Sequence, residues 1–418
     1  MNTSKRLRDV IYGFIHLDKQ ECEIINRPEF QRLRRIKQLA LTNMVYPGAM
    51  HTRFEHSLGV MQMASDMYDR ILDNTDTETL EACGLHEEQQ QKHYRKVVRL
   101  AALLHDIGHP PFSHAGEDLL PPLPKSNPPK HYKHEAYSVS IIQERFKGSI
   151  ENPQYGKIKV EEVIALIDDK FVLRKNYTSG LLAQIISGQI DADRADYLLR
   201  DSYHAGVKYG VYDHKILVNS LRIAKQTDHI EGTESHHIVI DKSGIHAVES
   251  LLIARYQMFM QVYRHKVRCA YNFHLEKACR EILLHVNKGI FKGVFPPPTK
   301  LDQYLLLDDI YMESRFREYG GYHGEIILNR NHWKQKYSSD DNPNSNEEIS
   351  KLKEKYGEEN IHIDTYSKPW YGGAKTILVY DKDKKLCKEL HEKSNLIDAL
   401  SKKTYSTRIF LNPEHNKD

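Results

Sequence analysis

The sequence contains no long apolar run and few cysteines. No stretch of about 18 or more apolar residues occurs in the chain, which argues against a membrane-spanning helix. The opening MNTSKRLRDVIYGFIH lacks the apolar core of a secretory signal. The five cysteines are scattered and form no C-x-x-C pair, as is typical of reduced thiols rather than a disulfide framework or zinc ribbon. We therefore expect a cytoplasmic protein with no membrane partner.

An excess of charge of either sign is also missing. The chain has 60 Lys and Arg against 57 Asp and Glu, a formal net charge of +3. Such a balance gives no support to a general polyanion-binding protein, so any anion site must be local. Histidine, in contrast, is plentiful, with 24 residues among 418.

Most of the region 28–280 has the periodicity of amphipathic helices. Apolar residues recur at helical spacing over 30–41 and 60–71, and KVVRLAALLHDIGH (96–109) predicts a buried helix that ends in polar residues. The proline-rich stretch 110–133 predicts a loop with one short helix, serving as a lid or wall of a site.

The last hundred residues have a different pattern. A polar run over 338–348 predicts an exposed loop, and KTILVY (375–380) and TRIFLN (407–412) predict strands that flank a helix around 394–403. We therefore expect a mainly α protein, with a helical catalytic core over 1–310 and a small α+β region over 311–418.

Four stretches carry residues suited to chemistry: HTRFEHS (51–57), HDIGHPPFSH (105–114), KHEAYS (133–138) and DADRADYLLRDSYHAG (191–206). An apolar helix that ends in His105 and Asp106 buries polar groups, at a cost of about a few kcal/mol each when they are unpaired. A metal ion compensates both groups at once, and mixed imidazole and carboxylate ligands suit Mn, Mg, Fe, Ni or Zn.

The remaining ligands must come from other helices. His56 is one candidate, and one of the three aspartates in DADRAD is the other. His109 lies on the same helical face as His105 and Asp106, near the ion but with its ring free to move protons.

These ordered motifs resemble the HD-domain phosphohydrolases. More narrowly they resemble the deoxynucleoside triphosphate triphosphohydrolases, the group of the bacterial dGTPases and the vertebrate sterile-alpha-motif HD-domain protein. The resemblance covers roughly residues 34–266 and implies an HD-domain helical core that cleaves a dNTP to a deoxynucleoside and inorganic triphosphate. The implied metal ligands are His56, His105, Asp106 and Asp193.

The resemblance also implies residues that handle protons and substrate. His109 would donate a proton to the leaving 5′-oxygen with His134 and Glu135 behind it, and Glu135 would orient His134. His114 would lie near the attacking water or the α-phosphate. The implied triphosphate ligands are Arg53, Arg194, Lys208 and Arg255. The implied sugar contacts are Gln38, Leu39, Tyr197, Asp201 and Tyr263, with Asp201 accepting from the 3′-OH and Tyr263 excluding a 2′-OH.

Some positions depart from the pattern of the relatives. Phe259 and Arg264 stand where some relatives carry histidine and glutamine, which affects the contacts to the base. Where the vertebrate relative binds a guanine activator, this chain has Asn26, Gln31 and Arg34, and the amide removes a charge-assisted acceptor. A nucleotide activator therefore stays an open question, and a homo-oligomer, dimer or tetramer, is expected by resemblance.

Two other functions are compatible with the motifs. One is an HD-type phosphohydrolase of another nucleotide, such as a monophosphate, a cyclic nucleotide or an alarmone. The other is weak single-stranded nucleic-acid binding or nuclease activity that uses RLRRIK (32–37), although such a run more often forms a solvated helix face.

Overall fold

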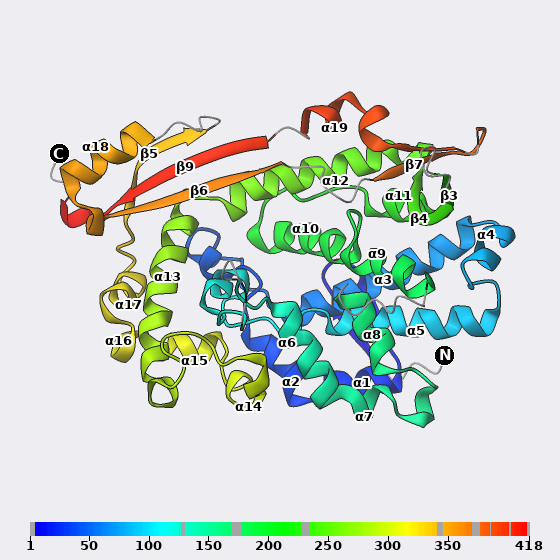
Figure 1. The fold of residues 1–418 in the computed structure, drawn as a ribbon, viewed down its shortest axis with the longest axis horizontal. Coiled ribbons are helices and arrows are strands. Elements are labelled where there is room, and N and C mark those ends of the chain that lie inside the picture. The colour runs from blue at the N-terminus through cyan, green and yellow to red at the C-terminus, as the bar shows by residue number, and fades with distance from the viewer. Residues whose placement is uncertain are drawn as a thin grey trace.

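The computed structural model describes residues 5–124, 126, 130–168, 177–227, 234–340, 346–369, 377–384, 386–400 and 403–415. The chain is mainly helical with small sheets, as the sequence predicts (Figure 1). The helices up to the middle of the chain are α1 (Lys19–Ile25), α2 (Pro28–Gln31), α3 (Arg53–Asn74), α4 (Thr77–Ala82), α5 (Glu88–Leu104), α6 (His134–Ile141), α7 (Lys147–Ile150), α8 (Val160–Ile167), α9 (Tyr177–Ser187), α10 (Ala192–Ala205) and α11 (His214–Asn219).

The later helices are α12 (Ile245–Met258), α13 (Lys266–His285), α14 (Leu301–Tyr304), α15 (Asp309–Glu313), α16 (Phe316–Tyr319), α17 (Gly321–Leu328), α18 (Asn346–Tyr356) and α19 (Asn395–Leu400). Within the described ranges, none of these helices has the length and apolar character needed to cross a membrane.

The strands form three sheets in the part of the chain that the structure describes. Strands β1 (Lys5–Asp9) and β2 (Gly13–Leu17) form an antiparallel hairpin. A four-stranded sheet has the order β3 (Leu221–Thr227), β4 (Glu234–Asp241), β7 (Leu378–Asp381), β8 (Leu386–Glu389), and a three-stranded sheet places β9 (Lys403–Leu411) between β5 (Lys334–Asp340) and β6 (Ile361–Pro369).

The four-stranded sheet joins the middle of the chain to its C-terminal part. Strand β7 pairs in parallel with β4, with Ile240 opposite Val379, while the other neighbours in this sheet pair antiparallel. This sheet therefore includes strands from both sides of residue 310. The domain boundary expected at this residue stays a prediction. The two larger sheets lie towards opposite ends of the molecule (Figure 1).

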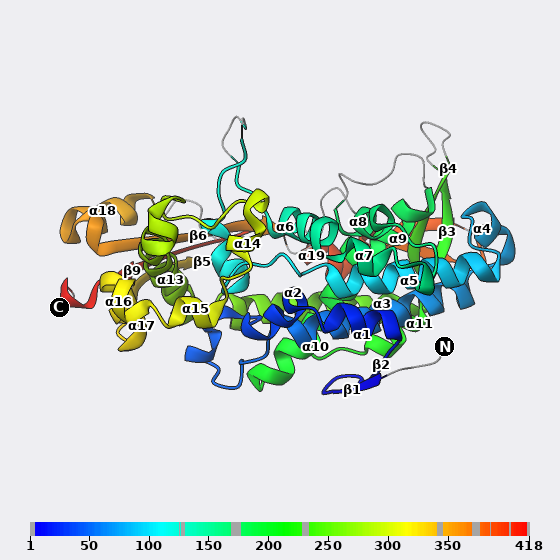
Figure 2. The same cartoon turned by 90° about the horizontal axis from the view of Figure 1, so that it is seen from below.

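Helices α3 and α5 lie side by side near the centre of the molecule, as both ribbon views show (Figures 1 and 2). The start of α3 is fixed by a capping box, in which the Thr52 backbone N–H donates to Glu55 Oε1 at 2.8 Å. Gly59 allows α3 to approach α10 closely, because a Cβ at this position would lie 2.0 Å from Asp196 Oδ1. These features explain how HTRFEH serves both as a helix start and as a contributor to an internal site.

The segment that follows α5 lies where two hydrophobic cores meet. Ile107 belongs to the larger core, which contains most of the buried side chains of α3, α5, α8, α9 and α10. Phe112 belongs to a second core built on α13. Gly108 brings this segment against α6, since a Cβ there would lie 2.2 Å from the backbone nitrogen of Ser138. The polar residues of HDIGHPPFSH therefore lie between the cores.

The structure corrects the expected helix over 30–41. Helix α2 ends at Gln31, a 3₁₀ turn covers Arg32–Arg35, and Ile36 is extended, with φ −121° and ψ 108°. Lys37 then pairs with Thr52 in an isolated β-bridge. The apolar spacing is still used for burial, because Phe30, Leu33 and Ile36 are fully buried, but in short pieces rather than one helix.

Some of the predicted segments extend beyond the described residues. The short helix expected within 110–133 is confirmed as a 3₁₀ segment, Ser113–Leu119, while residues 125 and 127–129 lie outside the described ranges. Three other pieces of predicted segments also lie outside the described ranges: 341–345 of the expected polar loop, 375–376 of the expected strand that overlaps β7, and 401–402 of the expected helix that contains α19.

Candidate active site

Three helices bring the four predicted metal ligands together. His56 lies on α3, His105 and Asp106 directly follow α5, and Asp193 lies in the first turn of α10. His56 Nε2 is 3.0 Å from Asp193 Oδ1 and 3.4 Å from Asp106 Oδ2. His105 Nε2 is 3.2 Å from Asp106 Oδ1 and 3.8 Å from Asp193 Oδ1. We refer to these four residues as the metal group.

The other ring nitrogen of each histidine already has a partner. His56 Nδ1 is 2.8 Å from Asp196 Oδ2, and His105 Nδ1 is 2.7 Å from the carbonyl oxygen of Ala102. Partners of this kind orient the ring and leave Nε2 for a metal ion. Among the described residues, neither Nε2 atom makes a hydrogen bond of acceptable geometry.

The donor atoms are also close enough for a shared ion. His56, His105 and Asp106 can each place one donor atom within 4.8 Å of the others. With the oxygen of Asp193 beside them, these buried nitrogen and oxygen atoms fit a divalent cation.

The charges in this region favour a cation. Burial lowers the pKa of His56, but the neighbouring carboxylates of Asp193, Asp196 and Asp106 outweigh burial and raise its pKa to about 10. Burial raises the pKa of Asp106, but the Arg53 guanidinium and the neighbouring histidines hold it well below its ordinary value. The carboxylates thus stay ionised and create a strongly negative potential at the two Nε2 atoms.

The other two aspartates of DADRAD have structural partners. Asp191 caps α10 by accepting a hydrogen bond from the Arg194 backbone at 2.7 Å. Asp196 accepts from Arg200 at 2.9 Å as well as contacting His56. Asp191 therefore makes a helix-end contact, and Asp196 makes an ion pair.

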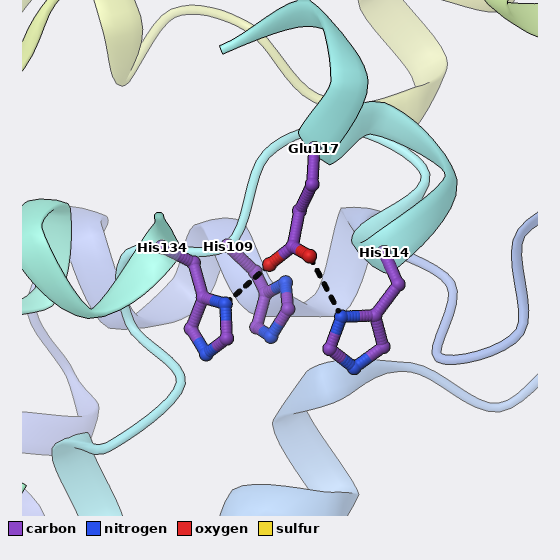
Figure 3. Close-up of side chains that lie close together, drawn as sticks. All are labelled: His109, His114, Glu117 and His134. Carbon is purple, nitrogen blue, oxygen red and sulfur yellow. Dashed lines mark hydrogen bonds and ion pairs between the residues drawn. The ribbon is translucent and has the colours of Figure 1, made fainter. Parts of the chain in front are cut away.

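A second cluster lies beside the metal group and contains His109, His114, Glu117 and His134 (Figure 3). One Glu117 oxygen is hydrogen-bonded to His134 Nδ1, and the other lies 3.2 Å from His114 Nδ1. The His109 and His134 rings stack with centroids 3.8 Å apart. His109 Nε2 is 3.3 Å from Asp106 Oδ1, so the two clusters meet at this contact. We refer to these four residues as the proton group.

The neighbouring carboxylates favour the protonated form of the His134 ring. Burial lowers the pKa of His134, but the hydrogen bond to Glu117 and the surrounding carboxylates outweigh burial, and the pKa is raised. Burial raises the pKa of Glu117, yet its contacts with His114 and His134 lower it strongly. For His109, burial and the charges of Arg53 and His134 lower the pKa well below the ordinary value.

Glu117 is the functional candidate that the sequence analysis missed. Glu135, the residue expected to orient His134, has its Oε2 atom 3.6 Å from His134 Nδ1, farther than a hydrogen bond. Instead, Glu117, which lies in the 3₁₀ segment Ser113–Leu119, is hydrogen-bonded to His134 Nδ1. Its place three residues after His114 was the available signal, since residues with this spacing share a face in a helical segment.

A cavity of about 940 Å³ opens beside both clusters. Its walls include most of the predicted substrate contacts: Gln38, Leu39, Arg53, Arg194, Tyr197, Asp201 and Tyr263. Arg255 and Lys208 are not among the cavity-lining residues that the structure describes, and Lys208 is exposed. The cavity continues to Asp364 and Tyr366 on β6, so the C-terminal region forms part of the wall.

Several of the predicted contacts are already held within the protein, among them Arg53 and Asp201. Arg53 donates from Nη1 to Asp106 Oδ2 at 2.5 Å and from Nε to Ser113 Oγ at 2.9 Å. Asp201 accepts from Tyr263 Oη at 2.6 Å and lies 2.7 Å from His51 Nε2. These contacts fix both side chains at the cavity wall.

Two family models match successive parts of the chain. The model described as the HD domain matches residues 53–201, which include the metal group and the proton group. The model described as the HD associated region matches residues 212–410.

Proteins similar to this chain include an archaeal and a human protein. The uncharacterized protein MJ1154 of Methanocaldococcus jannaschii is 37% identical over 79% of this chain, and the match covers 59% of that protein. The human deoxynucleoside triphosphate triphosphohydrolase SAMHD1 is 30% identical over 64% of this chain and 43% of its own length. The chain thus spans about half the length of these relatives.

Two solved structures are similar over nearly the whole chain. A hypothetical protein from Aquifex aeolicus has a TM-score of 0.76 at 31% identity, with coverage of 98% of this chain and 97% of that one. A phosphohydrolase from Bacteroides thetaiotaomicron has a TM-score of 0.74 at 26% identity, with coverage of 97% and 99%.

Proposed function

The chain belongs to the HD-domain phosphohydrolase family, and from this premise we propose that it is a metal-dependent dNTP triphosphohydrolase. The proposed reaction converts a dNTP and water to a deoxynucleoside and inorganic triphosphate. The observation that carries the proposal is the contact between the two clusters, where His109 Nε2 lies 3.3 Å from Asp106 Oδ1 at the wall of a nucleotide-sized cavity.

The metal group would hold the cation through His56, His105, Asp106 and Asp193. When bound, a divalent cation polarises a phosphoryl oxygen and activates water as a nucleophile. The chain itself keeps the ligands ready, because Asp196 and the Ala102 carbonyl fix the two imidazole rings, and Arg53 fixes Asp106.

The proton group would supply the proton that the reaction consumes at the leaving group. Attack of water on the α-phosphorus forms one P–O bond and breaks the bond to the 5′-oxygen, which leaves poorly unless it is protonated. Glu117 keeps a proton on His134, and His109 lies between His134 and Asp106. The water proton returns to this group and restores it for the next turnover.

The wall around Asp201 supports a deoxyribose substrate. Tyr263 is hydrogen-bonded to Asp201, which holds the ring at the cavity wall, where it would exclude a 2′-OH. Arg53 and Arg194 are cavity-lining guanidinium groups suited to phosphate oxygens. A homo-oligomer, a nucleotide activator and the identity of the metal stay predictions.

Product analysis tests the proposal. Purified protein is incubated with each of the four dNTPs and with Mn²⁺ or Mg²⁺, and the products are separated. Inorganic triphosphate with deoxynucleoside is the expected outcome. Pyrophosphate with a monophosphate, or no turnover, contradicts the proposal, and a ribonucleotide that competes equally would favour another nucleotide substrate.

Three of the four cations in RLRRIK are engaged in contacts within the protein, while Arg34 is exposed. Arg32 is buried and donates to the carbonyl oxygens of Leu307 and His109. Arg35 and Lys37 form ion pairs with Asp308 and Glu313 at 2.5 and 2.8 Å. These cations are therefore occupied within the protein.

A further inference from the structure

The backbone between His109 and His114 has an unfavourable conformation. Phe112 and Ser113 both lie in the left-handed region, with φ of 62° and 55°. Side chains disfavour this region, and two successive residues keep it only when the surrounding structure holds them there. The position of His114 in the proton group depends on this turn.

Residues 304–309 hold the backbone before this turn. Tyr304 donates from its hydroxyl to the Gly108 carbonyl oxygen at 2.7 Å. Arg32 bridges the two segments, since it donates to the carbonyl oxygens of His109 and Leu307, both at 2.9 Å. All of these groups are buried.

Asp309 holds the turn itself. One carboxylate oxygen accepts from the Phe112 backbone N–H at 2.7 Å, and the other accepts from the Lys37 backbone N–H at 2.9 Å. The side chain is buried, and burial raises its pKa to about 7, against the opposing effect of these two N–H groups and Lys37. A carboxylate is the side chain that offers an acceptor to each N–H in this geometry.

The contacts continue from Asp309 to the metal group. The Lys37 carbonyl oxygen accepts from Ser113 Oγ at 2.7 Å, and Ser113 Oγ accepts from Arg53 Nε at 2.9 Å. Arg53 in turn donates to Asp106. Asp309 therefore binds the backbone on both sides of the hydrogen bond between Ser113 and Lys37. It holds Phe112, which precedes Ser113, and it holds Lys37 itself.

We propose that Asp309 is a positioning residue that sets the geometry of the 108–114 segment, and through it the placement of His114 and Arg53. Asp309 lies outside the matched HD domain and within the HD associated region. The HD domain thus depends on this region for the shape of its catalytic segment. This inference rests on the proposed function in one respect, because the activity assay that tests it uses a dNTP as the substrate.

The test compares Asp309→Asn with Asp308→Asn in the full chain at pH 8, where Asp309 is ionised. Asparagine keeps the shape of Asp309 but replaces one acceptor by a donor that faces a backbone N–H. Asp308 is the matched control, because it caps α15 at Tyr311 and pairs with Arg35 without contacting the 108–114 segment. The readouts are amide hydrogen exchange over 106–116, kcat, KM and the thermal midpoint.

For Asp309→Asn we expect faster exchange over 106–116 and a fall in kcat of about 10- to 100-fold with KM changed much less. Asp308→Asn should match the unchanged protein in exchange and kcat. Equal exchange in the two variants, or faster exchange with unchanged kcat, overturns the proposal. So does a loss of kcat without faster exchange.

A second variant is used in case Asp309→Asn does not fold. Tyr304→Phe removes only the hydrogen bond to Gly108 and should change exchange and kcat in the same direction by less. Unchanged exchange in Tyr304→Phe then overturns the proposal. If the unchanged protein hydrolyses no dNTP, the proposed function fails, whereas hydrogen exchange still decides whether residues 304–309 hold the segment.

Discussion

The metal group and the proton group use the same residue types in opposite ways. In the metal group, each histidine has its Nδ1 occupied by a partner and its Nε2 directed towards the carboxylates. In the proton group, a single carboxylate, Glu117, contacts two histidines through their Nδ1 atoms. Two carboxylates with two fixed rings suit a divalent cation, and one carboxylate shared by two rings suits storage of a proton.

One histidine of each group differs strongly in exposure. The His56 side chain is fully buried, whereas the His114 side chain is 64% exposed. A fixed ion needs ligands that do not move, while a group that exchanges protons needs access to water and substrate. His109 joins the two, since it stacks on His134 and contacts Asp106.

The largest expected effect comes from removing the charge of Asp106. Asp106→Asn should lower dNTP turnover by about 10³-fold or more, because electrostatic stabilisation by a catalytic cation is worth several kcal/mol. Turnover and bound Mn²⁺ per chain are measured together, and both should fall. Asp213→Asn at the start of α11 is the control. Normal turnover and metal content in Asp106→Asn would place the ion elsewhere.

Replacing His134 should separate the two clusters functionally. His134→Gln removes the ring that Glu117 binds, and we expect turnover to fall about 100-fold, within the usual range for a lost acid or base. Bound Mn²⁺ should not change, because no hydrogen bond or ion pair joins His134 to the metal group in the described structure. A parallel loss of Mn²⁺ would show that the two clusters act as one.

The next effect concerns pH. In the folded protein the pKa of His134 is raised above its ordinary value, so its proton is kept to a higher pH and lost as pH rises through the raised pKa. Glu117→Gln removes the main raising contact, so the alkaline limb of the kcat profile should move to lower pH, with a loss of about tenfold at pH 8. If the alkaline limb of the kcat profile does not move in Glu117→Gln, Glu117 has no role in proton transfer.

The smallest effect is expected for Glu135. Its Oε2 atom lies 3.6 Å from His134 Nδ1, and an ion pair of this kind contributes about 1 kcal/mol or less. Glu135→Gln should therefore reduce turnover by less than about fivefold. If turnover in Glu135→Gln is as low as in Glu117→Gln, Glu135 and not Glu117 is the residue that orients His134.

Local patterns in the sequence were enough to predict the long helices and the histidine-rich stretches. The capped start of α3 and the apolar α5 ending before His105 are local features, and both occur in the structure. The parallel pairing of β4 with β7 depends on contact between segments far apart in sequence, which periodicity does not report.

The candidate site divides in the same way. Motifs indicate His56, His105 and Asp106, and the family resemblance adds Asp193. Glu117, in contrast, lies in a proline-rich stretch expected to be mostly loop. Asp309 is 197 residues from Phe112, and nothing in its local sequence marks it as a partner of that backbone. The burial of Arg32 was missed because a run of cations normally predicts a solvated face.

The location of the ion tests the account most directly, because both clusters contain enough histidine and carboxylate donors to bind a metal. Crystals soaked in Mn²⁺ and measured for anomalous scattering would show where the cation lies. We predict one strong peak within ligand distance of His56 Nε2, His105 Nε2 and the carboxylates of Asp106 and Asp193. A peak between His114, Glu117 and His134, with none at the metal group, would contradict the account.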